Sequence, residues 1–184
     1  MKKFEEKTIK TEHIFSGKVL SLRVDDVELP NGKQSKRELI KHPGAVAVIA
    51  VTDENKIVMV EQYRKAMEQS LIEIPAGKLE PGEEPAVTAV RELEEETGYV
   101  SGKMEYLISF YTSPGFADEI VHLYIAEELK KKENAAPCDE DEFVEVMEIT
   151  LEEALQYIRE KRIYDVKTAY AVQYLQLKEA LNKI

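Results

Sequence analysis

The sequence has only one cysteine, Cys138, which excludes a disulfide bond within the chain and fits a reducing compartment. It has no apolar run long enough to span a membrane, and the charged N-terminus MKKFEEKTIK lacks the apolar core of a signal peptide. Basic residues number 25 against 36 acidic ones, and the net charge of −11 argues against nucleic acid or an anionic membrane as the main partner. We therefore expect a cytoplasmic protein that binds neither nucleic acid nor membrane.

The sequence also lacks a recognisable arrangement for covalent catalysis. His13 and His42 show no ligand spacing, and His122 alternates with apolar residues on a predicted strand, which favours a structural role. No Ser, Cys or His stands in a suitable group with a base and an orienting residue. We expect any reaction to proceed without a covalent enzyme intermediate.

The 184 residues, 43% of them hydrophobic, are enough for one substantial domain with a small appendage. Residues 1–43 are predicted to form a small antiparallel sheet, with Pro30-Asn31-Gly32 as a turn. These strands carry too few apolar residues for a core of their own, so they must pack on the rest of the chain or on a second subunit. The predicted strands span 8–15, 19–29 and 35–41.

Residues 44–184 are predicted to form the second and main domain. Strands alternate with turns up to a first helix, and further strands and two helices follow. This order predicts an α/β fold in which helices cover both faces of a mixed sheet. The predicted strands span 45–51, 56–62, 71–74, 103–111, 120–127 and 142–149, and the predicted helices span 84–97, 151–160 and 166–183.

Residues 77–99 read GKLEPGEEPAVTAVRELEEETGY, and seven chemically specific residues stand in them at fixed offsets. At average residue usage, seven fixed identities recur by chance once in ~10^8 windows, so the pattern is restrictive. Pro85 suits the first position of a helix, and Gly98 suits its left-handed end. The seven residues are Gly77, Glu83, Arg91, Glu92, Glu95, Glu96 and Gly98.

Helical geometry places Glu92, Glu95 and Glu96 on one side of this predicted helix. An acidic triplet is most often a solvated face, but like charges at these spacings repel, and the helix C-terminus disfavours anions. A hard cation such as Mg²⁺ removes that conflict, because it requires clustered oxygen ligands. The predicted buried stripe beside these acids consists of Ala86, Val90 and Leu93.

The pattern resembles the signature of the Nudix hydrolases, which cleave diphosphates linked to another moiety. The resemblance implies a Nudix α/β/α sandwich and two or more Mg²⁺ ions, with Mn²⁺ as the alternative. It also implies that Arg91 anchors one of the acids, with Glu83 as a candidate partner or outer metal ligand. Tyr99 departs from the family in a usually aliphatic position, where we expect an effect on packing. The implied metal ligands are Glu92, Glu95, Glu96 and the carbonyl of Ala76.

Two segments outside the signature resemble the ADP-ribose pyrophosphatase subfamily. Pro114 lies 16 residues after Gly98, and the resemblance places Glu119 near the terminal ribose, although Ser-Pro-Gly would make a turn in any case. Arg64 closes the sequence EQYR and is a candidate contact for a diphosphate oxygen or for adenine, with an ion pair to Glu61 or Glu73 as the alternative. Glu73, in EIPAG, is a further candidate for substrate binding.

The acidic run 139–142 is the third such segment, and without the resemblance it would be interpreted as a solvated loop. In ADP-ribose pyrophosphatases a loop at this point supplies the general base and a further metal-contacting acid. The resemblance therefore assigns Glu140 as the base and Glu142 as the metal contact, with Glu92, Glu96 and Arg91 completing the catalytic set.

Related enzymes are dimers that exchange their N-terminal strands, which implies a homodimer here, with Arg37 reaching the partner's adenosine pocket. The implied reaction is hydrolysis of ADP-ribose to AMP and ribose 5-phosphate by attack of water on the diphosphate. Alternatives are another nucleoside diphosphate sugar or nucleotide as substrate, or a catalytically silent nucleotide-binding regulator.

Overall fold

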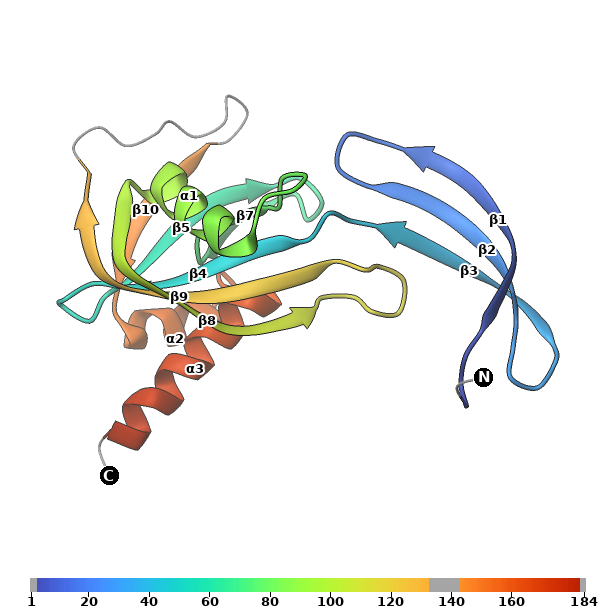
Figure 1. Cartoon of the computed structure of the whole chain (residues 1–184). Helices are drawn as coiled ribbons and strands as arrows, with labels where there is room; N and C mark the ends of the chain where they lie inside the picture. The colour runs from blue at the N-terminus through green and yellow to red at the C-terminus, as the bar shows by residue number, and fades with distance from the viewer. Residues whose placement is uncertain (1–2, 133–142, 183–184) are drawn as a thin grey trace. The chain divides into compact units, whose positions relative to one another are not determined.

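A computed structural model describes residues 3–132 and 143–182, and the chain divides into two compact units. The first unit comprises Met1–Gly44 and Tyr111–Ile120. The second comprises Ala45–Phe110 and Val121–Ile184. Each unit contains its own β-sheet (Figure 1).

The first unit contains a three-stranded antiparallel sheet in the order β1-β2-β3, which confirms the predicted strands. All ten residues of β1 are exposed, and Val27 is the one buried apolar residue among the described residues of this unit. Residues 111–120 join the unit through a bridge between Ile40 and Ala117. The sheet therefore has almost no core of its own. Its strands are β1 (Lys7–Ser16), β2 (Ser21–Glu28) and β3 (Gln34–Lys41).

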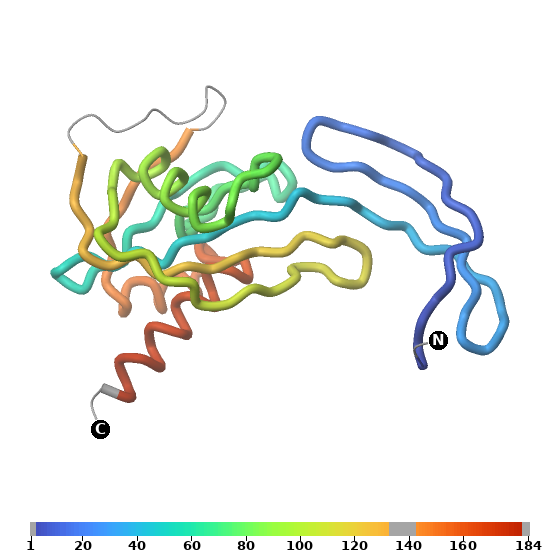
Figure 2. Tube along the Cα trace, viewed as in Figure 1, coloured from blue at the N-terminus to red at the C-terminus, as the bar shows by residue number. Residues whose placement is uncertain are grey.

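The second unit contains a seven-stranded mixed sheet in the order β10-β5-β4-β9-β8, with β6 paired to β5 and β7 to β4. Strand β4 runs parallel to β9 and antiparallel to β5 and β7. Strands β8 and β9 are hydrogen-bonded neighbours and lie side by side along the chain trace (Figure 2). The strands are β4 (Ala45–Val51), β5 (Ile57–Arg64), β6 (Gln69–Glu73), β7 (Ala76–Lys78), β8 (Tyr99–Tyr111), β9 (Ile120–Lys131) and β10 (Val144–Ile149).

The central strand β4 divides its side chains between two cores, as a strand buried on both faces must. Ala47 and Ile49 pack in the cluster that also contains residues of α2 and α3, whereas Val46 and Val48 pack in the cluster under α1. Helices therefore cover both faces of the sheet (Figure 1), and the predicted α/β/α sandwich is confirmed. The helices are α1 (Pro85–Thr97), α2 (Leu151–Arg159) and α3 (Val166–Asn182).

Helix α1 begins at Pro85 and ends at Thr97, and its C-cap Gly98 has φ 71° and donates its N–H to the carbonyl of Glu94 at 2.8 Å. Both ends agree with the expectation from the sequence.

The predicted buried face of α1 was wrong in part. Leu93 is buried, but Ala86 and Val90 are exposed. The side facing the sheet consists of Thr88, Ala89, Glu92, Leu93, Glu96 and Thr97. Glu92 and Glu96 thus lie on the buried side of the helix, whereas the prediction placed them next to that side.

Strand β7 was not predicted, because a three-residue Ala-Gly-Lys segment has no apolar alternation. Its pairing with Ala45–Ala47 of β4 defines it. Among the residues that the structure describes, no helix is long and apolar enough to cross a membrane.

Candidate functional site

Arg91 stands at the centre of the acidic side chains of α1. Its Nη1 donates to Glu92 at 2.9 Å and to Glu95 at 2.8 Å, and its Nη2 donates to Glu83 at 3.1 Å. The hydrogen bond to Glu83 is the largest of the effects that raise the pKa of Arg91, and those of the helix acids add to it. Arg91 is therefore a permanent cation among the carboxylates. Its predicted role as an anchor is confirmed, and Glu83 is one of its partners.

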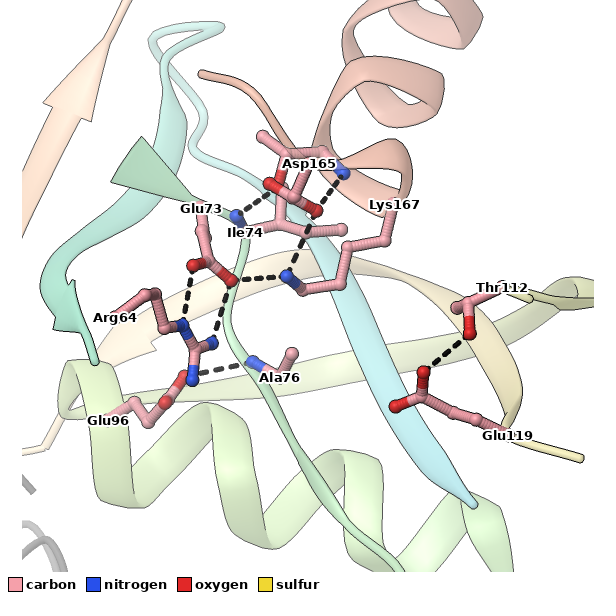
Figure 3. A network of polar contacts seen from close by, with 10 residues as sticks. Arg64, Glu73, Ile74, Ala76, Glu96, Thr112, Glu119, Asp165 and Lys167 are labelled. Carbon is pink, nitrogen blue, oxygen red and sulfur yellow. Dashed lines mark hydrogen bonds and ion pairs between the residues drawn. The ribbon is translucent and has the colours of Figure 1, made fainter. Parts of the chain in front are cut away.

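Glu96 lies against the backbone of β7. It is 4% exposed, and its Oε2 accepts the backbone N–H of Ala76 at 2.9 Å (Figure 3). This bond places Ala76, whose carbonyl was a predicted metal ligand, beside one of the predicted carboxylate ligands.

Gly77 leaves the space that the carboxylate of Glu92 occupies. A Cβ at Gly77 would lie 1.9 Å from Cδ of Glu92, and 2.0 and 2.3 Å from its two oxygens. No side chain fits there, so the first glycine of the signature permits the close approach of Glu92 to β7. Gly77 thus belongs to the site through its missing side chain.

The donor set suits a hard divalent cation. Three carboxylates, those of Glu83, Glu92 and Glu95, accept hydrogen bonds from Arg91, and the carboxylate of Glu96 accepts one from the Ala76 amide. The four carboxylates and one arginine leave a surplus of three negative charges (four minus one). Within residues 3–132 and 143–182, no three His, Cys, Asp or Glu side chains are grouped closely enough to hold one ion. The carboxylates engage Arg91 and the Ala76 amide in this arrangement. The oxygen chemistry of these side chains nevertheless fits a hard cation.

Arg64, at the end of β5, forms a bidentate ion pair with Glu73 of β6. Nε donates to Oε1 at 2.7 Å and Nη2 donates to Oε2 at 2.8 Å (Figure 3). The side chain of Glu73 is 2% exposed, whereas that of Arg64 is 36% exposed. Of the alternatives that the sequence left open for Arg64, the ion pair with Glu73 is present. Direct contact of Arg64 or Glu73 with a substrate stays a prediction.

Lys167 and Asp165, at the start of α3, complete this network and were missed by the sequence analysis. The Lys167 ammonium contacts the Glu73 carboxylate and also lies 3.0 Å from Asp165 Oδ1. Asp165 caps the helix by accepting the N–H of Thr168 at 3.1 Å. The signal available in the sequence was Asp165 itself, a preferred helix-capping residue directly before an apolar periodic segment.

We expect Glu73 to make stability depend on pH. Burial alone raises the pKa of Glu73, but the bonds and charges of Arg64 and Lys167 outweigh it and hold the pKa below its ordinary value. The stabilisation is therefore present above the pKa of an unfolded glutamate and is lost as the pH falls through the lowered folded-state value. In urea unfolding at pH 7, Glu73→Gln should lower the free energy of unfolding by a few kcal/mol. The difference from wild type should shrink below pH 4.

The matched control is Glu61→Gln, on the strand that carries Arg64. Glu61 pairs with Arg162 at 3.1 Å, and both side chains are far more exposed than Glu73, at 30% and 42%. An exposed pair contributes about 0–1 kcal/mol. The assignment of Glu73 as a buried anion would be refuted if both variants lost the same amount of stability. It would also be refuted if the loss of stability in Glu73→Gln did not change with pH.

In the first unit, Arg37 on β3 has its guanidinium edges occupied. Nε donates to Glu6 at 2.8 Å, Nη2 donates to Glu6 at 2.6 Å, and Nη1 donates to Ser35 Oγ at 3.0 Å. These bonds fix the orientation of the guanidinium. Its predicted contact with a partner's pocket stays a prediction.

Glu119, also in the first unit, is held by a hydroxyl and an imidazole. Thr112 Oγ1 donates to Glu119 at 2.5 Å, and His42 Nε2 lies 3.8 Å from its other oxygen. The N–H of Gly44 donates to His42 Nδ1 at 3.1 Å, so in the neutral ring Nε2 carries the proton that faces Glu119. His42 and Thr112 were not identified from the sequence as partners of Glu119.

The predicted base Glu140 and the predicted metal contact Glu142 lie outside the described residues. Both assignments stay predictions.

Tyr99, the departure from the family pattern, is 8% exposed and packs in the core cluster under α1. Its hydroxyl donates to Glu148 of β10 at 2.6 Å, which raises the pKa of Tyr99 to about 12. The tyrosine thus ties the start of β8 to β10 by a hydrogen bond that an aliphatic side chain could not make.

Comparison with known proteins gives two family matches. Residues 41–169 match the NUDIX domain, and residues 6–40 match the N-terminal domain of nucleoside diphosphate sugar hydrolases. The chain is 75% identical over 181 residues to the methanol dehydrogenase activator of Bacillus methanolicus, covering 98% of each chain. It is 67% identical over 182 residues to the ADP-ribose pyrophosphatase of Bacillus subtilis (strain 168), covering 99% of this chain and 98% of that protein.

A crystal structure of an ADP compounds hydrolase resembles this fold with a TM-score of 0.82 at 18% identity. The match covers 97% of this chain and 95% of that one. At this identity the likeness concerns the fold alone.

Proposed function

The chain belongs to the Nudix hydrolase family, and we propose that within it the protein hydrolyses ADP-ribose to AMP and ribose 5-phosphate. The observation that carries the proposal is the group of acids on α1, held around Arg91 and against the backbone of Ala76–Gly77. The relative that is 67% identical over nearly the whole chain, an ADP-ribose pyrophosphatase, supports the choice of substrate.

Nudix hydrolases use divalent metal ions, and we propose two or more Mg²⁺ ions here, with Mn²⁺ as a substitute. Glu92, Glu95 and Glu96, with the carbonyl of Ala76, would hold them. When bound, the ions neutralise the diphosphate and stabilise the charge that develops at phosphorus. They also resolve the conflict between an anionic substrate and a chain of net charge −11.

The chain's own residues bind the substrate and move the proton. Arg64, partly exposed at the end of β5, would orient a diphosphate oxygen with its guanidinium. Arg91 keeps Glu92 and Glu95 in place on α1. Glu140 would take the proton of the water that attacks phosphorus, and Glu142 would be a further metal contact. No covalent intermediate is required.

The first unit would supply the remaining substrate contacts in a homodimer with exchanged N-terminal strands. Apolar side chains of this unit are exposed in the single chain, among them Phe4 (76%), Phe15 (57%) and Ile14 (51%), which favours burial against a second copy. Arg37 would reach the partner's adenosine pocket, and Glu119 would contact the terminal ribose. Light scattering should give twice the 21.0 kDa chain mass. A monomer at micromolar concentration would contradict the exchange.

The test of the function is a substrate panel with Mg²⁺. We expect ADP-ribose to give the highest kcat/KM among ADP-ribose, ADP-sugars, GDP-mannose, dinucleotides and deoxynucleoside triphosphates, with products identified by chromatography. A clear preference for another diphosphate would overturn only the assignment of ADP-ribose as the substrate. Absence of turnover on every compound would overturn the proposed activity.

The relative that is 75% identical favours a second candidate function, activation of an alcohol dehydrogenase. The wild-type chain and a hydrolysis-deficient variant such as Glu96→Gln should be added to methanol dehydrogenase of Bacillus methanolicus. Activation by both proteins would indicate a regulator that does not need turnover. Activation by the wild type alone would link regulation to hydrolysis, and no activation would exclude this candidate for that enzyme.

A further inference from the structure

Glu73 is a buried carboxylate shared by two cations from different parts of the fold. Arg64 contributes two hydrogen bonds from β5, and Lys167 contributes its ammonium from the first turn of α3 (Figure 3). The Glu73 side chain is 2% exposed, and a buried carboxylate requires such compensation. Glu73 therefore presents its charge to these two residues rather than to solvent.

Lys167 is itself fixed at the start of α3. Its side chain is 14% exposed, and Asp165, which caps the helix, lies 3.0 Å from its ammonium. The next residue, Thr168, accepts the backbone N–H of Ile74 at 3.1 Å and so attaches the helix start to the segment after β6. The ammonium therefore has little freedom to leave the carboxylate of Glu73.

Arg64 is the exposed end of this network. Its side chain is 36% exposed, whereas Glu73 and Lys167 are largely buried. Besides Glu73, the charge of Glu96 on α1 also contributes to the raised pKa of Arg64, so the guanidinium lies within the field of the acidic site. Within the described part of the chain, Nη1 of Arg64 makes no hydrogen bond, while Nε and Nη2 both face Glu73.

We propose that Lys167 is a positioning residue that holds the Glu73 carboxylate so that Arg64 presents its guanidinium, still effectively cationic, to the diphosphate of the substrate. Alone, Glu73 would cancel the charge of Arg64. Lys167 contacts the same carboxylate, which leaves Glu73 less able to neutralise Arg64, and Asp165 fixes the ammonium from its other side. This inference rests on the proposed function, and it assigns to Lys167 a role in substrate affinity.

The test is Lys167→Met, assayed with ADP-ribose and Mg²⁺. We expect KM to rise about tenfold, the effect of losing one charge-assisted interaction, while kcat stays within about twofold. Lys178→Met is the matched control, because Lys178 lies on the same helix and pairs with Glu127 on the surface. It should leave both constants unchanged. Lys167→Arg, which keeps the charge, should recover most of the affinity.

A double-mutant cycle with Arg64→Met separates positioning from general destabilisation. If Lys167 acts through Arg64, the double variant should have nearly the same KM as Arg64→Met alone. Additive effects on KM, or an unchanged KM in Lys167→Met, would overturn the inference. If Lys167→Met does not fold, Lys167→Gln keeps a donor without the charge, and its KM should rise in the same way.

Failure of this inference is distinguishable from failure of the proposed function. Wild-type turnover of ADP-ribose with an unaffected Lys167→Met variant would overturn only the role of Lys167. If the wild type shows no turnover, calorimetric binding of ADP-ribose becomes the readout. Weaker binding by the Lys167 variants would then support the positioning role, and equal or absent binding would overturn it.

Discussion

Replacing Glu96 with glutamine is expected to abolish nearly all hydrolysis of ADP-ribose while leaving the fold intact. Loss of a residue that only orients a metal ligand costs about 10–100-fold, so loss of a ligand should cost more than about a hundredfold. Glutamine keeps an oxygen that can accept the N–H of Ala76, the bond that Glu96 makes at 2.9 Å. The decisive measurement is kcat with saturating Mg²⁺, together with urea unfolding.

In the absence of metal, the Glu96→Gln variant should be at least as stable as the wild type. Glu96 is buried beside other acids near the C-terminus of α1, where removal of a negative charge relieves repulsion and an unfavourable helix dipole. Glu94→Gln is the matched control on the same helix, because Glu94 pairs with Lys132 at 2.6 Å and is no predicted ligand. Glu94→Gln should retain activity. Wild-type turnover in Glu96→Gln would show that the metal assignment is wrong.

Replacing Gly77 with alanine is expected to reduce activity far more than stability. The new Cβ would lie 1.9 Å from Cδ of Glu92, a distance that no real contact allows, so the carboxylate must move. The end of a glutamate side chain moves at little energetic cost, and the loss of stability should therefore be small. Displacement of a catalytic group by about 1 Å can cost about a hundredfold in rate, which is the loss we expect in kcat.

Gly115→Ala is the control for this variant. A Cβ at Gly115 meets no atom within 4 Å, and its backbone is not in the left-handed region that favours glycine. Its activity and its urea midpoint should match those of the wild type. If Gly77→Ala kept full activity, or lost activity only in proportion to stability, the close approach of Glu92 to β7 would have no functional role.

The sequence predicted the elements of the fold well because most strands and helices carry strong local signals. Pro85 and Gly98 delimit α1 at the positions where the helix begins and ends. Strand β7 had no such signal, because its existence depends on pairing with β4, more than 25 residues earlier in the chain.

The buried face of α1 could not be deduced from apolar periodicity. The prediction assumed that Ala86 and Val90 face the core and that the acids lie beside them. In the structure Glu92 and Glu96 occupy the buried side, because Arg91 and the backbone of Ala76 satisfy their oxygens. A buried polar group that has partners overrides the preference of apolar residues for the interior.

Contacts between residues that are distant in the sequence also limited how much of the site could be predicted. The pairing of Arg64 with Glu73, nine residues apart, could be considered from the sequence because Arg64 closely follows the predicted strand 56–62 and Glu73 lies in the next predicted strand. Lys167 is 94 residues from Glu73, and only the packing of α3 against the sheet brings the two together. Residue type alone gave no reason to prefer this lysine over others on the same helix.

We propose that this chain hydrolyses a diphosphate with water at the acidic site of α1. Product analysis tests this proposal most directly, with ADP-ribose incubated with the wild-type protein and Mg²⁺ in ¹⁸O-labelled water. We expect equal amounts of AMP and ribose 5-phosphate, with one labelled oxygen in one of the two phosphates and no products when EDTA removes the metal. Intact ADP-ribose in the presence of Mg²⁺, or products without label, would contradict it.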